Sequence, residues 1–444
     1  MTDAMRLPAV DEGHIRTGRP GVIGIAAVFS GRGPELATIR ARVVERWSEL
    51  PRVSWTLRPP PRRPGIRAGA SLSSHRWAAA TSAFDPESQV LAADEKLEPL
   101  LRTVIEQPLP TDLPLWRMWL TEGASYGGDF AVVLLAHHGL MDGRSLETLM
   151  RLLMDEPPSS RRFARPPQPS AVTMKDAGRE LRRMRAGGQA LPLPSPRAAE
   201  ASVAVADLPA QVIRAARRLP AGGPDATLNE LLLGSLAGAL RARYGPVARW
   251  PEAPAPLHAT VPVDLRSGAD AYRLGNIVTA LRLPLPVDGD SPADRLRACQ
   301  RLCAELPART EVHRKVLPLL EAAARPGPWV PALLARHLMQ PDVTPTVCTA
   351  FKWRDRASTL HGRPLVRVIP LPQLHRPGTA NLCLMQTGDT YTLTVVSNHR
   401  PGEATELGDA VARELEQLAA GQKGTPSGVS GAPTQDDTDE TWSC

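Results

Sequence analysis

The sequence has few cysteines, few aromatic residues and no long apolar run. An odd, scattered set of cysteines argues against a disulfide framework and favours a cytosolic protein; the set is Cys299, Cys303, Cys348, Cys383 and Cys444. No stretch of about 18 apolar residues occurs, so no membrane-spanning helix is predicted. The N-terminal residues lack the charged-then-apolar layout of a signal peptide. We therefore expect a cytoplasmic protein.

Neither a metal site nor a nucleic-acid site is predicted. Cys299 and Cys303 lie four positions apart on a predicted helix, but no second pair or nearby histidine completes a ligand set. We interpret both as small apolar helix positions and expect no metal and no cofactor. The net charge of +7, from 53 basic and 46 acidic residues, is a mild excess for 444 residues. No aromatic or motif support for nucleic-acid binding accompanies it.

The length and the distribution of proline predict two domains. A chain of 444 residues exceeds one ordinary core, and its 42% of hydrophobic residues can fill two. Prolines and arginines concentrate between positions 156 and 200, which indicates an interdomain linker with one short amphipathic helix. We expect an N-terminal half over 1–155, a C-terminal half over 201–421, and a disordered tail over 422–444.

Each half mixes strands and helices, so the predicted fold class is α/β. Short apolar runs predict strands, and periodic apolar stripes predict helices. In the first half we expect strands over 21–29, 116–122 and 130–136, with helices over 34–49, 93–107 and 143–154. In the second half we expect strands over 258–263, 276–283, 346–352, 365–369, 381–386 and 391–397, with helices over 209–218, 225–243, 291–340 and 403–419.

The chemistry is predicted where the apolar strand over 130–136 ends. It delivers His137-His138-Gly139-Leu140-Met141-Asp142-Gly143. Adjacent strand residues point to opposite faces, so only one histidine can address a given cleft. Gly143 permits a tight turn before the next helix. One neutral imidazole suffices to remove a proton from a hydroxyl or amine that attacks an activated acyl group. The spacing equally fits a structural histidine pair with Asp142 as a helix cap.

The motif His137-His138-x-x-x-Asp142-Gly143 resembles the active-site motif of the acyltransferase superfamily with a chloramphenicol-acetyltransferase-like fold. Further blocks resemble its wax ester synthase/diacylglycerol acyltransferase branch. They are Leu7–Asp11, Pro114-Leu115-Trp116, Thr227-Leu228-Asn229-Glu230, Val261-Pro262-Val263-Asp264-Leu265-Arg266 and Leu274-Gly275-Asn276. Together the matches span about residues 7–420.

The resemblance implies two αβ sandwich halves with an active-site tunnel between them and His138 as general base. His137 would orient the site, and Asp142 would be structural with Arg266 as its partner. Asn276 would donate a hydrogen bond or end a turn, and Trp116 would pack around the site. Acyl-CoA, a substrate rather than a cofactor, or an acyl-carrier protein would supply the acyl group to a small-molecule alcohol or amine.

Several questions stay open at the level of the sequence. Where the family carries a Ser-Asn-Val-Pro-Gly-Pro-like segment, residues Pro345–Trp353 have neither the Asn nor the Pro-Gly. One alternative is therefore a carrier-protein-dependent condensation enzyme that makes an ester or amide. A second is a binding homologue without catalysis. The acyl chain length, the acceptor, the oligomeric state and peripheral contact with a lipid surface are likewise open. The remaining eight histidines, His14 among them, are interpreted as isolated surface or core residues.

Overall fold

The computed structural model describes residues 4–17, 21–60, 74–79, 84–124, 127–156, 172–192, 199–218, 224–251, 254–267, 270–325, 327–353 and 358–422. The tail predicted over 422–444 lies outside them except for its first residue, which ends a helix. Most of the proline-rich part of the linker also lies outside the described residues.

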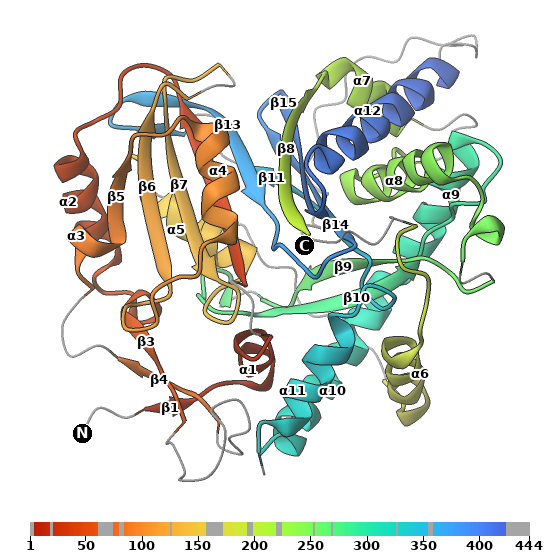
Figure 1. Cartoon of the computed structure of the whole chain (residues 1–444), viewed down its shortest axis with the longest axis horizontal. Helices are drawn as coiled ribbons and strands as arrows, with labels where there is room; N and C mark the ends of the chain where they lie inside the picture. Colours follow the sequence, from red (N-terminus) through yellow and green to blue (C-terminus); the bar gives the residue numbers. More distant parts are fainter. Residues whose placement is uncertain are drawn as a thin grey trace.

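Two six-stranded sheets lie side by side, each with helices packed on it (Figure 1). The sheet of the N-terminal half has the order β12-β13-β2-β7-β6-β5. Its strands are β2 (Val22–Phe29), β5 (Val90–Ala93), β6 (Trp116–Glu122), β7 (Phe130–His137), β12 (Thr359–Leu360) and β13 (Arg363–Leu371). A small third sheet packs below it and contains β1 (Met5–Arg6), β4 (Arg76–Ala79) and β3 (Trp55–Arg58).

The sheet of the C-terminal half has the order β10-β9-β11-β14-β15-β8. Its strands are β8 (Glu200–Leu208), β9 (His258–Asp264), β10 (Val278–Pro284), β11 (Thr346–Trp353), β14 (Thr379–Thr387) and β15 (Thr390–His399). The second apolar core lies between this sheet and its covering helices; these are α7 (Ala210–Arg217), α8 (Leu228–Tyr244), α9 (Pro292–Cys303) and α12 (Glu403–Gln422).

The remaining helices line the N-terminal half or the lower side of the molecule in Figure 1. They are α1 (Ala9–Ile15), α2 (Leu36–Trp47), α3 (Pro86–Gln89), α4 (Leu97–Glu106), α5 (Gly143–Leu152), α6 (Met174–Arg185), α10 (Leu306–Ala323) and α11 (Trp329–Leu338). Two 3₁₀ turns, Pro51–Ser54 and Val247–Arg249, complete the described elements. Among the described residues, no helix combines the length and apolar character that crossing a bilayer requires.

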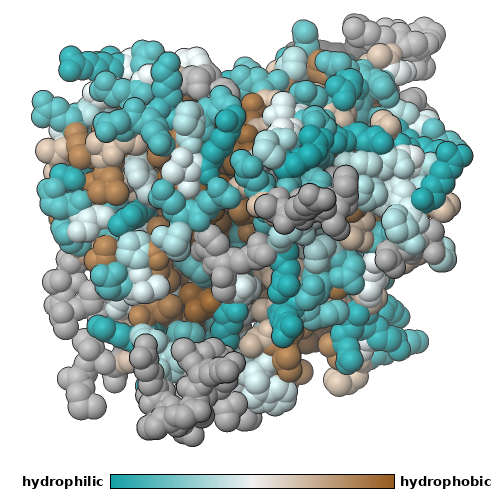
Figure 2. Space-filling model, viewed as in Figure 1, coloured by the Kyte–Doolittle hydropathy of each residue, from teal (hydrophilic) through white to brown (hydrophobic). Residues whose placement is uncertain are grey.

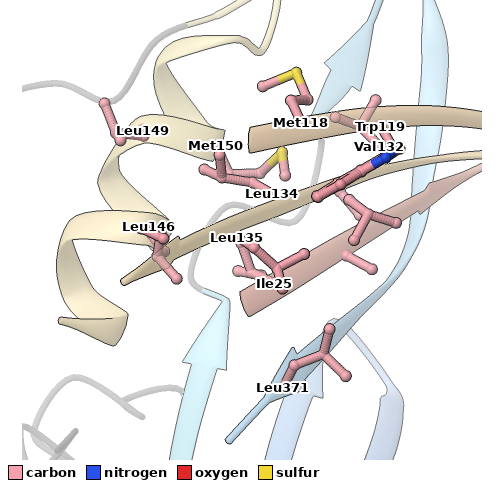
Figure 3. Packing of buried hydrophobic residues seen from close by; sticks show 14 of the residues in the cluster. Ile25, Met118, Trp119, Val132, Leu134, Leu135, Leu146, Leu149, Met150 and Leu371 are labelled. Atoms are coloured by element: carbon pink, nitrogen blue, oxygen red, sulfur yellow. The ribbon is translucent and has the colours of Figure 1, made fainter. Parts of the chain in front are cut away.

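The N-terminal core explains why the strand before the histidines is so apolar. Helix α5 packs on β2 and β7, and Figure 3 shows Leu146 and Met150 of α5 facing Leu134 and Leu135 of β7. All eight residues of β7 are buried, because β2 and β6 flank it within the sheet and helices cover it. A strand buried on both faces needs a continuous apolar run rather than an alternating one. The fixed end of this strand is what positions the histidines.

The two halves are joined by strands of one half that pair in the sheet of the other. Strands β12 and β13 lie within the C-terminal half along the chain, between β11 and β14, yet β13 pairs antiparallel with β2 in the N-terminal sheet. The apolar cluster of the N-terminal half also includes Val203, Trp353, Met385 and Val396. The range 201–421 is therefore not self-contained: part of it completes the sheet of the other half. That the two halves are separate domains stays a prediction.

Several local predictions need correction. The helix expected over 93–107 begins only at Leu97, because Val90–Ala93 pairs parallel with β6 as a strand. Strand β8 was not predicted, and it occupies the edge beside β15. Val44, an apolar residue of the helix predicted over 34–49, is 40% exposed in α2. The linker does contain the expected short helix, α6.

Candidate active site

The end of β7 places the two histidines on different sides of the chain. His137 is the last residue of the strand, and residues 138–140 form the turn that follows. Its carbonyl accepts hydrogen bonds from the amides of Leu140 at 2.8 Å and Met141 at 3.2 Å. The turn therefore separates His138 from the strand, and the two imidazoles have different surroundings.

His137 faces into the protein. Its Nδ1 accepts a hydrogen bond from the amide of Gly139 at 3.0 Å, and the residue is 8% exposed. Burial and the neighbouring His138 lower the pKa of His137 to about 4, so the ring is neutral at ordinary pH. These contacts hold the turn, which fits the orienting role predicted for this residue.

Gly21 allows the chain to pass this close to the histidines. Its φ of 59° lies in the left-handed region, and an added Cβ would lie 2.7 Å from Nε2 of His137. Its carbonyl accepts a hydrogen bond from the amide of His138 at 2.8 Å. No larger residue could bring this backbone contact to His138 without moving the His137 ring.

His138 is half-buried beside α1. Its Nδ1 is enclosed and has no hydrogen-bond partner among the described residues. Burial lowers the pKa of His138 below the ordinary value, against the opposing influence of its own main chain and of Asp142. The imidazole is thus kept in its neutral form, which is the form that can accept a proton.

Asp142 ties the two halves together. It is 1% exposed. One carboxylate oxygen, Oδ1, accepts from the amide of Ser145 at 2.8 Å and so caps helix α5, while Oδ2 accepts from the amide of Ile277 at 2.7 Å. Its own amide donates to the carbonyl of Gly275 at 3.0 Å. The aspartate therefore joins the histidine turn, the start of α5 and the segment before β10.

Arg266 is the partner of Asp142 in the structure, as the resemblance implied. Its Nη1 lies 2.9 Å from Oδ2 of Asp142 and 2.9 Å from Oδ1 of Asp264, and its Nε donates to the carbonyl of Arg273. Burial alone would raise the pKa of Asp142, but Arg266 and the amides of Ile277 and Ser145 hold it below the ordinary value. The ion pair is thus charged, buried and shared between the halves.

Gly143 was expected to permit a tight turn before the helix, and this expectation was wrong. Gly143 is the first residue of α5, its φ is not positive, and an added Cβ would meet nothing within 4 Å. The tight position is Gly139, where a Cβ would lie 3.0 Å from the carbonyl oxygen of Asp11 and 3.2 Å from Nδ1 of His137. The turn therefore depends on Gly139 rather than on Gly143.

Asn276 and Trp116 have contrasting surroundings. Both polar atoms of the Asn276 side chain are enclosed without a hydrogen-bond partner among the described residues, next to the Gly275 and Ile277 backbone that holds Asp142. Trp116 is fully buried in the N-terminal core, where its Nε1 donates to the carbonyl of Val53 at 2.8 Å. Trp116 is a packing residue, whereas Asn276 has unused hydrogen-bonding capacity.

Other residues singled out in the sequence have structural explanations. Thr227 and Glu230 form a reciprocal capping box at the start of α8. Cys299 is buried on α9. Among the described residues, no group of three or more histidine, cysteine, aspartate or glutamate side chains could hold a metal ion. Strand β11, which contains the altered 345–353 segment, extends Trp353 into the core of the N-terminal half.

His14 is the site residue that the sequence did not reveal. Its ring stacks on that of His138, with centroids 4.2 Å apart and planes 9° from parallel. His75, which contacts Glu12 at 2.9 Å, and His313, which contacts Thr279 at 2.6 Å, have hydrogen-bond partners and fit the interpretation as structural residues. Only the Leu7–Asp11 block hinted that α1 belongs to the site.

Comparison with solved structures shows the class of fold. A wax ester synthase/diacylglycerol acyltransferase from Marinobacter aquaeolei VT8 superposes with a TM-score of 0.62 and 17% identity, covering 94% of this chain and all of that one. The first condensation domain of the calcium-dependent antibiotic synthetase gives a TM-score of 0.65 at 17% identity, covering 94% and 96%. The predicted α/β fold, shared with these two structures, is confirmed.

Sequence comparison points to one family within this fold. Residues 91–235, less than half of the chain, match the model of the wax ester synthase/diacylglycerol acyltransferase catalytic domain. A Mycobacterium tuberculosis candidate diacylglycerol O-acyltransferase is 27% identical over 243 residues, 46% of this chain and 49% of that protein. A Mycobacterium bovis relative is 28% identical over 337 residues, 63% of each chain. The matched stretches thus cover between about half and two thirds of these relatives.

Proposed function

We propose that the protein transfers an acyl group from a thioester, acyl-CoA in the first instance, to an alcohol, with His138 as the general base. The observation that carries this proposal is the neutral, half-buried imidazole of His138 at the end of β7. The family, whose members include a wax ester synthase/diacylglycerol acyltransferase, supports ester formation. A starter condensation domain of the same fold, solved with C8-CoA, supports a thioester donor.

The reaction needs one proton acceptor and no covalent intermediate. With Nδ1 enclosed, Nε2 of His138 takes the proton of the acceptor hydroxyl while the oxygen attacks the thioester carbonyl. The tetrahedral oxyanion then collapses, the carbon–sulfur bond breaks, and the imidazolium returns its proton to the departing thiolate. Asn276 is the candidate donor to the reacting groups, since its amide is enclosed and unsatisfied.

The test is release of free thiol from a panel of acyl-CoAs and acyl-carrier proteins, each offered with pooled alcohols and with pooled amines. Acceptor-dependent release with acyl-CoA and an alcohol supports the proposal. Release only from acyl-carrier protein would replace it with the condensation-type reaction. If a folded protein released no thiol with any acceptor, the binding-homologue alternative would take its place.

We expect the acid limb of the pH profile of kcat/KM to lie below pH 6.5, which is the ordinary pKa of histidine. Burial disfavours the imidazolium form, so His138 stays a competent base until the pH falls through its depressed pKa, and activity is then lost. Thiol release measured from about pH 5 to about pH 8 locates the limb. An acid limb above pH 6.5 would contradict the assignment of a buried neutral base.

We further propose a lipid surface as a peripheral partner, docked on the exposed residues of α6, α10 and α11. Among the described residues, seven large apolar side chains are exposed, and five of them lie on these helices: Met174, Leu181, Leu319, Trp329 and Leu333. Lys175, Arg179, Arg182, Arg185 and Arg336 are exposed on the same helices. Figure 2 shows brown atoms under α10 and α11 beside teal ones. Apolar side chains with adjacent cations suit an anionic bilayer.

Replacing Trp329 and Leu333 together by glutamate should weaken binding to vesicles of phosphatidylglycerol and phosphatidylcholine by about tenfold or more, because two apolar contacts become charges. The strength of binding is measured by sedimentation of the protein with the vesicles. Val44→Glu on α2 is the matched control, since Val44 is 40% exposed on another side of the fold. Equal binding by all three proteins would exclude this surface.

A further inference from the structure

The contact between His14 and His138 has no counterpart in the reaction described so far. The two imidazoles lie face to face at 4.2 Å, and Nδ1 of His14 is enclosed without a hydrogen-bond partner among the described residues. An enclosed ring nitrogen without a hydrogen-bond partner is uncommon in a residue that only fills the core. The stacked ring therefore calls for an account in terms of the site.

Helix α1, which carries His14, is held from two sides. Arg52 donates from Nη2 to Asp11 at 2.8 Å and from Nε to the carbonyl of Leu140 in the histidine turn at 2.9 Å. On the other side, the amide of Ala9 donates to Glu321 of α10 at 2.7 Å. Helix α1 thus bridges the histidine turn and the C-terminal half, which places the backbone of His14 beside His138.

Burial, more than the charges nearby, keeps His14 neutral. On its own helix, Asp11 pairs with Arg52, and Glu12 pairs with Arg16 and His75. The titratable neighbours from other elements are His137 and His138 of the turn, His375, and Glu321, Arg336 and His337 of the helices α10 and α11 near or packed on α1. Burial first, and then the three nearby histidines, lower the pKa of His14 well below its ordinary value.

A neutral flat ring at this distance does two things for a base. It restrains the plane of the His138 imidazole. The other restraint on this imidazole is the protein that encloses its Nδ1. The flat ring also presents a π face to the imidazolium that forms when His138 takes up a proton, well within the ~6 Å range of a cation–π contact. A second protonated ring at 4.2 Å would instead repel that charge.

We propose that His14 is a positioning residue that acts as a neutral aromatic support for the catalytic ring of His138. This inference rests on the proposed function, because it requires His138 to be the base. It assigns no proton transfer to His14. What matters is the flat ring, so another neutral aromatic side chain should serve in its place.

The test compares His14→Phe with His14→Leu. Both side chains are apolar and of similar bulk, but only phenylalanine is flat. We expect His14→Phe to keep kcat within about threefold of the wild type, and His14→Leu to lose about tenfold to a hundredfold in kcat with little change in KM, because a misplaced base loses orientation. The acid limb of kcat/KM should stay at the wild-type pH in His14→Phe.

Each outcome decides between alternatives. Inactivity of a folded His14→Phe would mean that His14 itself carries a proton, and equal activity of the two variants would show that no flat ring is needed; either result overturns the inference. If His14→Leu does not fold, His14→Met supplies the second non-aromatic side chain. His138→Ala measured alongside separates the two hypotheses: activity that survives there defeats the general base, whereas the His14 variants alone test the support.

Discussion

Replacing His138 with alanine is expected to lower kcat by about 10²–10⁴-fold, the usual contribution of a general base. The ring is the one neutral imidazole that the end of β7 leaves half-buried rather than facing the core, and no nucleophilic residue motif accompanies it. The measurement is acceptor-dependent thiol release under saturating donor. KM for the donor should change little, since the interaction lost belongs to proton transfer rather than to binding.

His138→Gln is the matched variant. Glutamine keeps a polar side chain of similar reach but cannot accept a proton near neutral pH, so it should be as slow as alanine. His137→Asn gives the comparison on the opposite side, because an amide oxygen can still accept from the amide of Gly139; we expect a smaller loss. Near-normal turnover in either His138 variant would remove this residue from the chemistry.

The sequence was most informative where a local pattern had a local cause. The continuous apolar runs of β2 and β7 predicted buried strands, because such strands have no solvent-facing side. It was least informative about pairing. Nothing within Arg363–Leu371 indicates that β13 pairs with β2 rather than with strands of its own half, since pairing depends on distant residues. Strand β8 was missed because its alanines, Ala201, Ala204 and Ala206, favour no strand.

The residues of the candidate site were likewise only partly predictable from the sequence. The spacing of His137, His138 and Asp142 was visible in the sequence, whereas the Arg266 partner came from the resemblance alone. The stack of His14 on His138 could not have been predicted, because it arises from how α1 is tied down by Arg52 and by α10. Contacts between distant elements were not predicted, and helix α1 itself was not expected from the sequence.

Asp142→Asn is expected to lower the free energy of unfolding by about 3 kcal/mol, the lower end of the cost of breaking a buried ion pair. Asparagine can still accept from the amide of Ser145, and Asp264 still pairs with Arg266, so the loss should not reach the upper end. Because the same carboxylate anchors Ile277 and the histidine turn, turnover should fall together with stability. The unfolding midpoint in urea and thiol release measure the two effects.

The control for this variant is another buried ion pair remote from the histidine turn. Glu414 of α12 and Arg295 of α9 lie 2.5 Å apart, with both side chains about as buried as those of Asp142 and Arg266. Glu414→Gln should lower the unfolding midpoint while thiol release at low temperature stays at the wild-type rate. If Asp142→Asn kept full stability but lost turnover, the aspartate would act on the reaction itself, and its role as the tie between the halves would be wrong.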